Sequence, residues 1–188
     1  MTEPLSLEFE VSCSAERAFT VWTSRIDSWW PADHTVTGRA DLDVVLEPRL
    51  GGRIYERTPD GTEHDWGEVT LWEPPHRLGY LWHLRRDRAD ATDVEIRFRP
   101  AGSHRTVVEV AHRGWERLGA DADVWRDRNR MGWTTLLPHF ARRRRAVSRR
   151  SAAPPTTRWA VGTGCARATG AASACTSRRC WRHSAGPS

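Results

Sequence analysis

The sequence predicts an α+β protein in which a curved antiparallel β-sheet has helical structure at each end. Two observations predict this fold: a run of strand-like segments joined by turns, and a helical pattern on each side of that run. Between residues 43 and 112, strand-like segments follow one another and are separated by turn-forming residues such as Pro59-Asp60-Gly61. Strands joined by tight turns of this kind run antiparallel, as in a meander. One strand and a helical region precede this run, and a longer helical pattern follows it.

The N-terminal part predicts one strand and then a helix. Residues 5–11 alternate apolar and polar side chains, which is the pattern of a strand with one buried face. Ser14 can cap the helix that follows, because its hydroxyl can accept a hydrogen bond from a free backbone N–H. Phe19 and Trp22 lie three residues apart on one face of that helix, and Pro31 ends the helical region.

Six further strands and a long helix complete the predicted order. Paired glycines at 51 and 52 suit a bend between the first two strands, and Ala101-Gly102-Ser103 joins the last two. The final helix carries Leu136 and Phe140 among its apolar anchors. We expect Pro138 to kink it, since the proline ring removes one amide donor. The strands are predicted at residues 43–48, 52–57, 63–73, 76–84, 92–100 and 105–112, and the helix at 121–143.

The composition divides the chain into two unlike parts. All 24 acidic residues lie at or before Asp127. Residues 144–188 are rich in Arg, Ala, Ser, Thr, Gly and Pro and contain no Leu, Ile, Phe, Tyr or Met. Such a segment cannot bury enough apolar surface to offset the entropy of ordering. We therefore predict a domain over residues 1–143 and a disordered, Arg-rich, low-complexity tail over 144–188.

The function of that tail stays open at this point. It is a disordered extension, such as a GC-rich gene read out of frame, or a basic arm, or a zinc site formed by Cys165, Cys175, Cys180 and His183. The zinc site is the least favoured of the three, because its first two cysteines are ten residues apart and lack the CxxC spacing. Clustered arginines bind phosphates without needing a fold, so nucleic acid or an anionic membrane could be reached only through the tail. We do not expect nucleic acid to be the partner of the domain itself.

The composition and motifs also exclude several classes of function. No stretch approaches the roughly 18 apolar residues that span a bilayer, and the N-terminus lacks the pattern of a signal peptide. We expect a cytoplasmic protein with reduced thiols. We find no Gly-rich phosphate loop, no nucleophile paired with a histidine and no metal-ligand spacing, so we expect no cofactor and no metal. The oligomeric state is left open.

Four stretches, taken in order, resemble one known superfamily. They are LEPRLGGRIYER, DGTEHDWGEVTLWEPPHRLGYLW, TDVEIRFRP and RTVVEVAHRGWERLG. Over residues 5–143 the chain resembles the START-like, or SRPBCC, superfamily, and within it the bacterial proteins related to the activator of the heat-shock protein 90 ATPase. The resemblance implies a helix-grip fold, in which a curved antiparallel sheet wraps around a long C-terminal helix and leaves a cavity between them. Members hold apolar molecules in that cavity, and a few are cyclases or other enzymes.

The strand phases predict which side chains face the helix. Tyr80 and Trp82 share the apolar phase of their strand, and His83 is expected to face outward. His112 continues the inward phase of the last strand. Trp66 takes the phase opposite to Val69 and Leu71, so alternation alone does not place it. The same inward phase covers Leu78 and Leu84, then Val94, Ile96 and Phe98 with Glu95 outward, then Val108 and Val110.

Large rings on neighbouring strands have two interpretations. Each ring can fill the core, or it can form the wall of a cavity, where Trp and Tyr offer an apolar face and one polar group. Charged residues around the glycine bend are expected to form surface ion pairs; these are Glu47, Arg49, Arg53, Glu56 and Arg57. The residues that we expect to line the cavity are Trp30, Trp66, Glu68, Tyr80, Trp82, His112, Trp115 and Trp133.

The sequence therefore indicates a protein that binds a small apolar or aromatic ligand. Two alternatives remain open. A cyclase-like or hydrolytic enzyme would use Tyr80, His112 or Glu68 as polar groups in the same water-poor cavity. A co-chaperone-type module that binds another protein is the second alternative. No residue is assigned a catalytic role, and whether the protein is an enzyme is left open.

Overall fold

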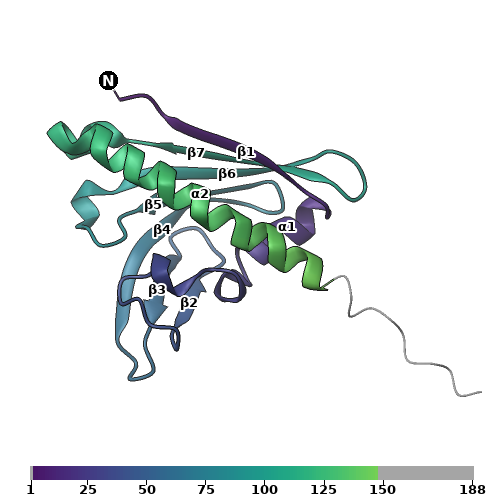
Figure 1. Ribbon diagram of the computed structural model, residues 1–188, viewed down its shortest axis with the longest axis horizontal. Coiled ribbons are helices and arrows are strands. Elements are labelled where there is room, and N and C mark those ends of the chain that lie inside the picture. The colour runs from purple at the N-terminus through teal and green to yellow at the C-terminus, as the bar shows by residue number, and fades with distance from the viewer. Residues whose placement is uncertain (1, 148–188) are drawn as a thin grey trace, which may run out of the picture. The chain divides into compact units, whose positions relative to one another are not determined.

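The structure, a computed structural model, describes residues 2–147, and the predicted tail lies outside them except for its first four residues. Seven strands form one antiparallel sheet in the order β1-β7-β6-β5-β4-β3-β2 (Figure 1). This confirms the predicted α+β architecture and each predicted strand. The strands are β1 (Leu5–Val11), β2 (Asp43–Leu46), β3 (Arg53–Arg57), β4 (Glu63–Glu73), β5 (Arg77–Trp82), β6 (Thr92–Pro100) and β7 (Thr106–Arg113).

Two α-helices flank these strands in the sequence, α1 (Ala15–Trp22) and α2 (Ala122–Val147). The predicted cap of α1 is confirmed, because the Ser14 hydroxyl accepts a hydrogen bond from the amide of Arg17. The helix α2 continues past Pro138 to Val147, so proline does not end it, and the predicted kink stays a prediction. Short 3₁₀ turns are η1 (Ile26–Ser28), η2 (Ala32–His34), η3 (Arg88–Asp90) and η4 (Trp115–Asp121).

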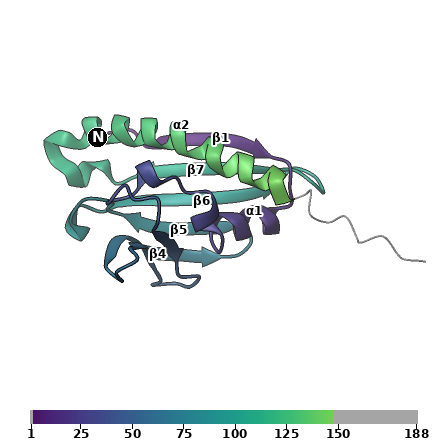
Figure 2. The ribbon, with the colours of Figure 1, turned by 60° about the horizontal axis from the view of Figure 1, so that its bottom comes forward.

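The sheet bends, and α2 lies across one of its faces. Strands β1, β7 and β6 run side by side, whereas β4, β3 and β2 turn away from their direction (Figure 1). Both helices lie on the same face of the sheet (Figure 2). This arrangement is a helix-grip fold, as predicted, because the curved sheet partly wraps around the long helix α2.

Bulges in β4 account for part of this bend. The ladder with β3 pairs Ile54 with Gly67 but Tyr55 with Asp65, so Trp66 is an extra residue on β4. A second irregularity places Thr70 between the paired positions Val69 and Leu71. Each bulge shifts the alternation of side chains by one residue and increases the local twist. As a result Trp66 and Val69 belong to the core and Trp72 packs against it, which strict alternation would not allow.

Aromatic rings join the two helices to the sheet at the centre of the core. Trp22 of α1 lies 4.9 Å from Phe140 of α2 and 5.9 Å from Phe98 of β6, measured between ring centroids. Both contacts are edge-to-face, and such pairs add about 0.5–1.5 kcal/mol each beyond the burial of their apolar area. Trp29 packs between Trp22 and Phe140. These contacts pack the C-terminal half of α2 against α1 and the sheet.

Candidate ligand-binding pocket

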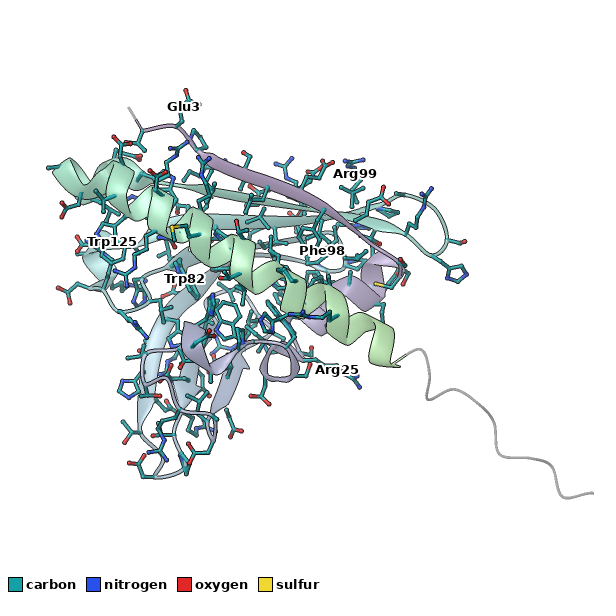
Figure 3. The ribbon with its side chains drawn as sticks, viewed as in Figure 1. Glu3, Arg25, Trp82, Phe98, Arg99 and Trp125 are labelled. Carbon is teal, nitrogen blue, oxygen red and sulfur yellow. The ribbon has the colours of Figure 1, made fainter. Side chains whose placement is uncertain are left out.

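A pocket of about 170 Å³ lies between α2 and the end of β5. Three segments of the chain form it: the turn around η2, the end of β5 with the residues after it, and the N-terminal half of α2. Figure 3 shows Trp82 and Trp125 on the same side of α2, near its N-terminal half. The lining residues are Trp30, Asp33, His34, Trp82, Leu84, Arg85, Trp125, Arg128, Asn129, Gly132, Trp133 and Leu136.

Three of the predicted cavity residues form the apolar wall of this pocket. Trp30 and Trp82 contact each other with ring centroids 5.8 Å apart, and both rings stay partly exposed. The indole N–H of Trp30 donates to the carbonyl oxygen of His34 at 3.1 Å, which orients the ring. Trp133 reaches the same space from α2. Of Trp29 and Trp30, the first is packed in the core and the second borders the pocket.

Trp66 packs behind the rings of Trp30 and Trp82 and does not line the pocket. It is fully buried, and its ring lies 5.2 Å from that of Trp30 and 6.0 Å from that of Trp82. Its indole N–H donates to a carboxylate oxygen of Glu56 at 3.1 Å. The bulge described above turns Trp66 inward.

Glu56 corrects one of the sequence predictions. We expected a surface ion pair, but its side chain is completely buried. Its carboxylate accepts hydrogen bonds from the backbone amides of Val36 at 2.6 Å and Thr37 at 2.9 Å, besides the indole of Trp66. Glu56 therefore ties the segment after η2 to β3. The predicted surface pairs do form at its neighbours, where Arg53 and Arg57 share Glu63.

His112 lies behind the pocket wall, in a chain of hydrogen bonds that leads from α2 to β5. The indole N–H of Trp133 donates to Nδ1 of His112 at 3.1 Å, so Nε2 carries the proton and donates to Thr92 Oγ1 at 2.7 Å. The Thr92 hydroxyl in turn donates to the carbonyl oxygen of Trp82 at 3.2 Å. His112 has no exposed surface, and burial lowers its pKa to about 3. It is a neutral residue that holds the ring of Trp133 and, through Thr92, the backbone at Trp82, and it does not line the pocket.

The remaining predicted site residues lie elsewhere. Glu68 does not line the pocket, and its carboxylate forms an ion pair with Arg88. Tyr80 is buried against Trp82, and burial raises the pKa of its phenol far above the neutral range. Trp115 is buried in contact with His112 and borders a smaller hollow next to the pocket.

The prediction that His83 faces outward is wrong, because only 8 % of its surface is exposed. Strand β5 ends at Trp82, and the chain then turns through Arg85, whose φ is +62°. The alternation of a strand no longer applies after its last residue.

The mouth of the pocket is polar. His34 contacts Asp33 through Nδ1 at 2.9 Å and the hydroxyl of Thr135 through Nε2 at 2.8 Å, which joins the η2 turn to α2. The ring of Trp125, which also lines the pocket, has two guanidinium groups close to it. The carbons at their centres lie 4.4 Å (Arg86) and 4.9 Å (Arg128) from the ring centroid. Cation–π contacts of this kind hold an arginine in place without neutralising its charge.

Sequence reasoning missed the α2 residues of the pocket other than Trp133. Their spacing was a usable signal, because Trp125, Asn129, Gly132 and Leu136 lie three or four residues apart, on one face of a helix. Nothing in the sequence pattern could have indicated Arg85 or His34. Both belong to irregular segments whose position depends on contacts with distant residues.

A sheet that curls around a C-terminal helix and leaves a pocket between the two defines a helix-grip protein. A sequence model described as "Activator of Hsp90 ATPase homolog 1-like protein" matches residues 12–143. The chain belongs to that family, which is part of the START-like, or SRPBCC, superfamily, as the resemblance predicted. A search of curated proteins found no match.

Solved structures agree with this fold. Protein MLL2253 from Mesorhizobium loti is 19 % identical, with a TM-score of 0.56 over 79 % of this chain and 99 % of that one. Protein NE0264 from Nitrosomonas europaea is 16 % identical, with a TM-score of 0.54 over 77 % and 95 %. At such identities these likenesses show the fold alone.

A third solved structure is more similar in sequence. It is the anthrahydroquino-γ-pyrone synthase Txn09, which is 38 % identical over 64 % of this chain and 82 % of that one, with a TM-score of 0.47. At that TM-score, no argument about the function of this chain rests on the likeness.

Two features are absent from the described residues 2–147. No helix there is long and apolar enough to cross a membrane. The same residues contain no group of three or more His, Cys, Asp or Glu side chains placed to hold a metal ion.

Proposed function

We propose that this protein binds a small, mainly apolar molecule that carries an aromatic ring. One observation carries the proposal: four tryptophans surround a space of about 170 Å³. Indole rings offer large rigid apolar faces and one hydrogen-bond donor each, which suits them to holding a flat ligand. Trp30 and Trp82 keep part of their surface exposed beside this space, whereas Trp66 behind them has none.

The size of the pocket limits the ligand. An apolar cavity of about 150 Å³ is large enough to bind benzene, whereas drug-sized ligands occupy about 300–1,000 Å³. A volume of about 170 Å³ therefore accommodates one ring, and any further part of the ligand lies at the mouth. For so small a ligand we expect a dissociation constant between about 1 mM and 1 µM, or about −4 to −8 kcal/mol.

The enzyme alternative has less support. The three polar groups that it would use, Glu68, Tyr80 and His112, do not line the pocket. His112 also has both ring nitrogens in hydrogen bonds. Turnover of an aromatic polyketide by the purified protein would favour an enzyme over a binding protein.

The co-chaperone alternative rests on the family name, and no surface feature described above favours it. A stable complex with a heat-shock protein 90 chaperone in a sedimentation experiment would support it.

The binding proposal can be tested with benzyl alcohol, an uncharged one-ring probe. The full chain, labelled with ¹⁵N, is titrated while the indole N–H resonances are followed by NMR. We expect the resonances of Trp30, Trp82 and Trp133 to shift with one common dissociation constant. The proposal is wrong if these three resonances do not move at millimolar probe.

A pair of matched variants separates the pocket from the rest of the core. Trp82→Ala removes a pocket wall and should weaken binding about tenfold or more, because most of the ring contact is lost. Trp72→Ala is the control. Trp72 is also a partly buried ring, but it packs on Phe19 of α1 and does not line the pocket. This control should bind the probe as the wild type does.

A further inference from the structure

The geometry points to a more specific ligand class: an aromatic carboxylic acid whose ring enters the pocket and whose carboxylate lies between Arg85 and Arg128. This inference rests on the proposed function, because it assumes that a ring occupies the apolar part. Both arginines line the pocket, beside the tryptophans of its wall. The arrangement places two guanidinium groups next to the apolar wall of the pocket.

Both guanidinium groups are held by uncharged partners. Arg85 donates through an Nη atom to the carbonyl oxygen of Thr35, and Arg128 lies over the ring of Trp125. Neither forms an ion pair with a carboxylate of the described residues. Their neighbours differ in this respect, because Arg86 pairs with Asp90 and Arg88 with Glu68. The two pocket arginines are thus positioned while their charge stays uncompensated, as a site for a carboxylate requires.

The backbone conformation of Arg85 supports its assignment to a binding site. Its φ of +62° lies in the left-handed region, and Arg85 is the only residue other than glycine with a positive φ in the described chain. Such conformations are uncommon for a residue with a Cβ, and they cluster at binding sites. Here the turn brings Arg85 back over the pocket directly after the strand that supplies Trp82.

Other charged groups nearby do not cancel this positive charge. Asp33 also lines the pocket, and its hydrogen bond with His34 lowers the pKa of Asp33 and so keeps its carboxylate negative. This single negative charge pairs with neither Arg85 nor Arg128, so the two arginines outweigh it in the pocket lining. Asn129 uses one amide proton on the carbonyl oxygen of Trp125, and its other polar atoms can meet a ligand. A hollow beyond Arg85 is lined by four acidic residues. Three of them, Glu63, Asp65 and Asp90, form ion pairs with arginines. The fourth is Asp87.

The test compares benzoate with benzamide, which has nearly the same shape and no charge. Both are titrated into the ¹⁵N-labelled full chain, and dissociation constants are read from the indole N–H resonances of the pocket tryptophans. These resonances report on the pocket only, so benzoate that binds to arginines elsewhere on the surface does not affect the measured dissociation constants. We expect benzoate to bind about threefold to tenfold more tightly than benzamide at low salt, since exposed ion pairs contribute little each. The ratio should shrink at 0.5 M NaCl, where such charges are screened over about 4 Å.

Substitutions then assign this preference to the two arginines. Arg85→Gln and Arg128→Gln should each reduce it, and the double variant should bind both probes equally. Arg130→Gln is the matched control: Arg130 is exposed on the same helix, forms no ion pair within the described residues and does not line the pocket. It should keep the wild-type ratio.

The possible outcomes separate the two proposals. If benzamide shifts the pocket indoles but benzoate binds no more tightly, the carboxylate inference is wrong and the ring-binding proposal stands. If neither compound shifts them, the ring-binding proposal fails as well. If the double variant does not fold, the salt dependence of the wild-type ratio decides alone: a ratio that stays unchanged by salt overturns the inference.

Discussion

The indole nitrogen of Trp133 lies 3.1 Å from Nδ1 of His112, and this hydrogen bond joins the long helix to the last strand behind the pocket wall. His112 is completely buried, and burial lowers its pKa to about 3. The histidine is therefore neutral in the folded protein at neutral and mildly acidic pH. Its function in the fold is to hold Trp133, and through Thr92 the end of β5, in place.

This pKa predicts how stability depends on pH. The unfolded histidine has a pKa of about 6.5, so below that pH the unfolded chain binds a proton that the folded protein does not. The free energy of unfolding should fall as pH decreases from about 6.5, by about 2 kcal/mol at pH 5 from His112 alone. His112→Gln can keep both hydrogen bonds and does not titrate. Urea unfolding at pH 8 and pH 5 should show a smaller loss for the variant, and equal losses would contradict the assignment.

Glu56 should be one of the most sensitive positions in the protein. Glu56→Ala leaves the amides of Val36 and Thr37 and the indole of Trp66 without their shared acceptor. Because hydrogen bonds to a buried charged group contribute about 1.5–3 kcal/mol each, we expect a loss of about 3 kcal/mol or more. Glu63→Ala, which breaks exposed ion pairs on the same hairpin, is the control and should change stability far less. Denaturant titration measures both, and similar losses would refute the role of Glu56.

The two neighbouring indoles Trp66 and Trp82 should differ in their effect on stability. Trp66→Ala empties a fully enclosed site and should destabilise the protein by about 3–5 kcal/mol. Trp82→Ala should cost less, because one side of that ring already borders open space. Thermal and urea unfolding of both variants test this order. If Trp82→Ala proves as damaging as Trp66→Ala, Trp82 is a core ring and no wall.

Gly132 offers a way to close the pocket without damaging the core. A Cβ built on this residue would meet no atom within 4 Å, and Gly132 lines the pocket. Gly132→Ala should stabilise α2 by about 1 kcal/mol, since glycine is a poor residue for a helix interior. Gly132→Leu should fill the pocket and abolish probe binding while the protein remains folded. Unfolding curves and the benzyl alcohol titration check the two effects, and normal binding by Gly132→Leu would place the ligand elsewhere.

Much of the fold was predictable, because it depends on patterns that are local in the chain. Alternation along residues 92–100 and 105–112 determined which side chains face α2, and the turn residues determined that the strands pair with their neighbours. The segments that resemble the SRPBCC superfamily identified the helix-grip arrangement. Trp30, Trp82 and Trp133, which the sequence analysis names as cavity residues, border the pocket, and that they bind a ligand stays a prediction.

Only the tertiary structure decided which of these rings border the pocket and which support it. The bulge at Trp66 shifts the alternation by one residue, and nothing in the strand pattern marks where an extra residue is accommodated. Glu56 has the same local sequence pattern as a surface residue, and it is buried because the segment after η2 folds back over it with free backbone amides. Arg85 reaches the pocket through a turn held by Thr35, fifty residues earlier in the chain. Periodicity determines the direction of a side chain within one helix or strand. A pocket depends instead on how separate elements meet. Packing between residues far apart in the sequence determines how they meet.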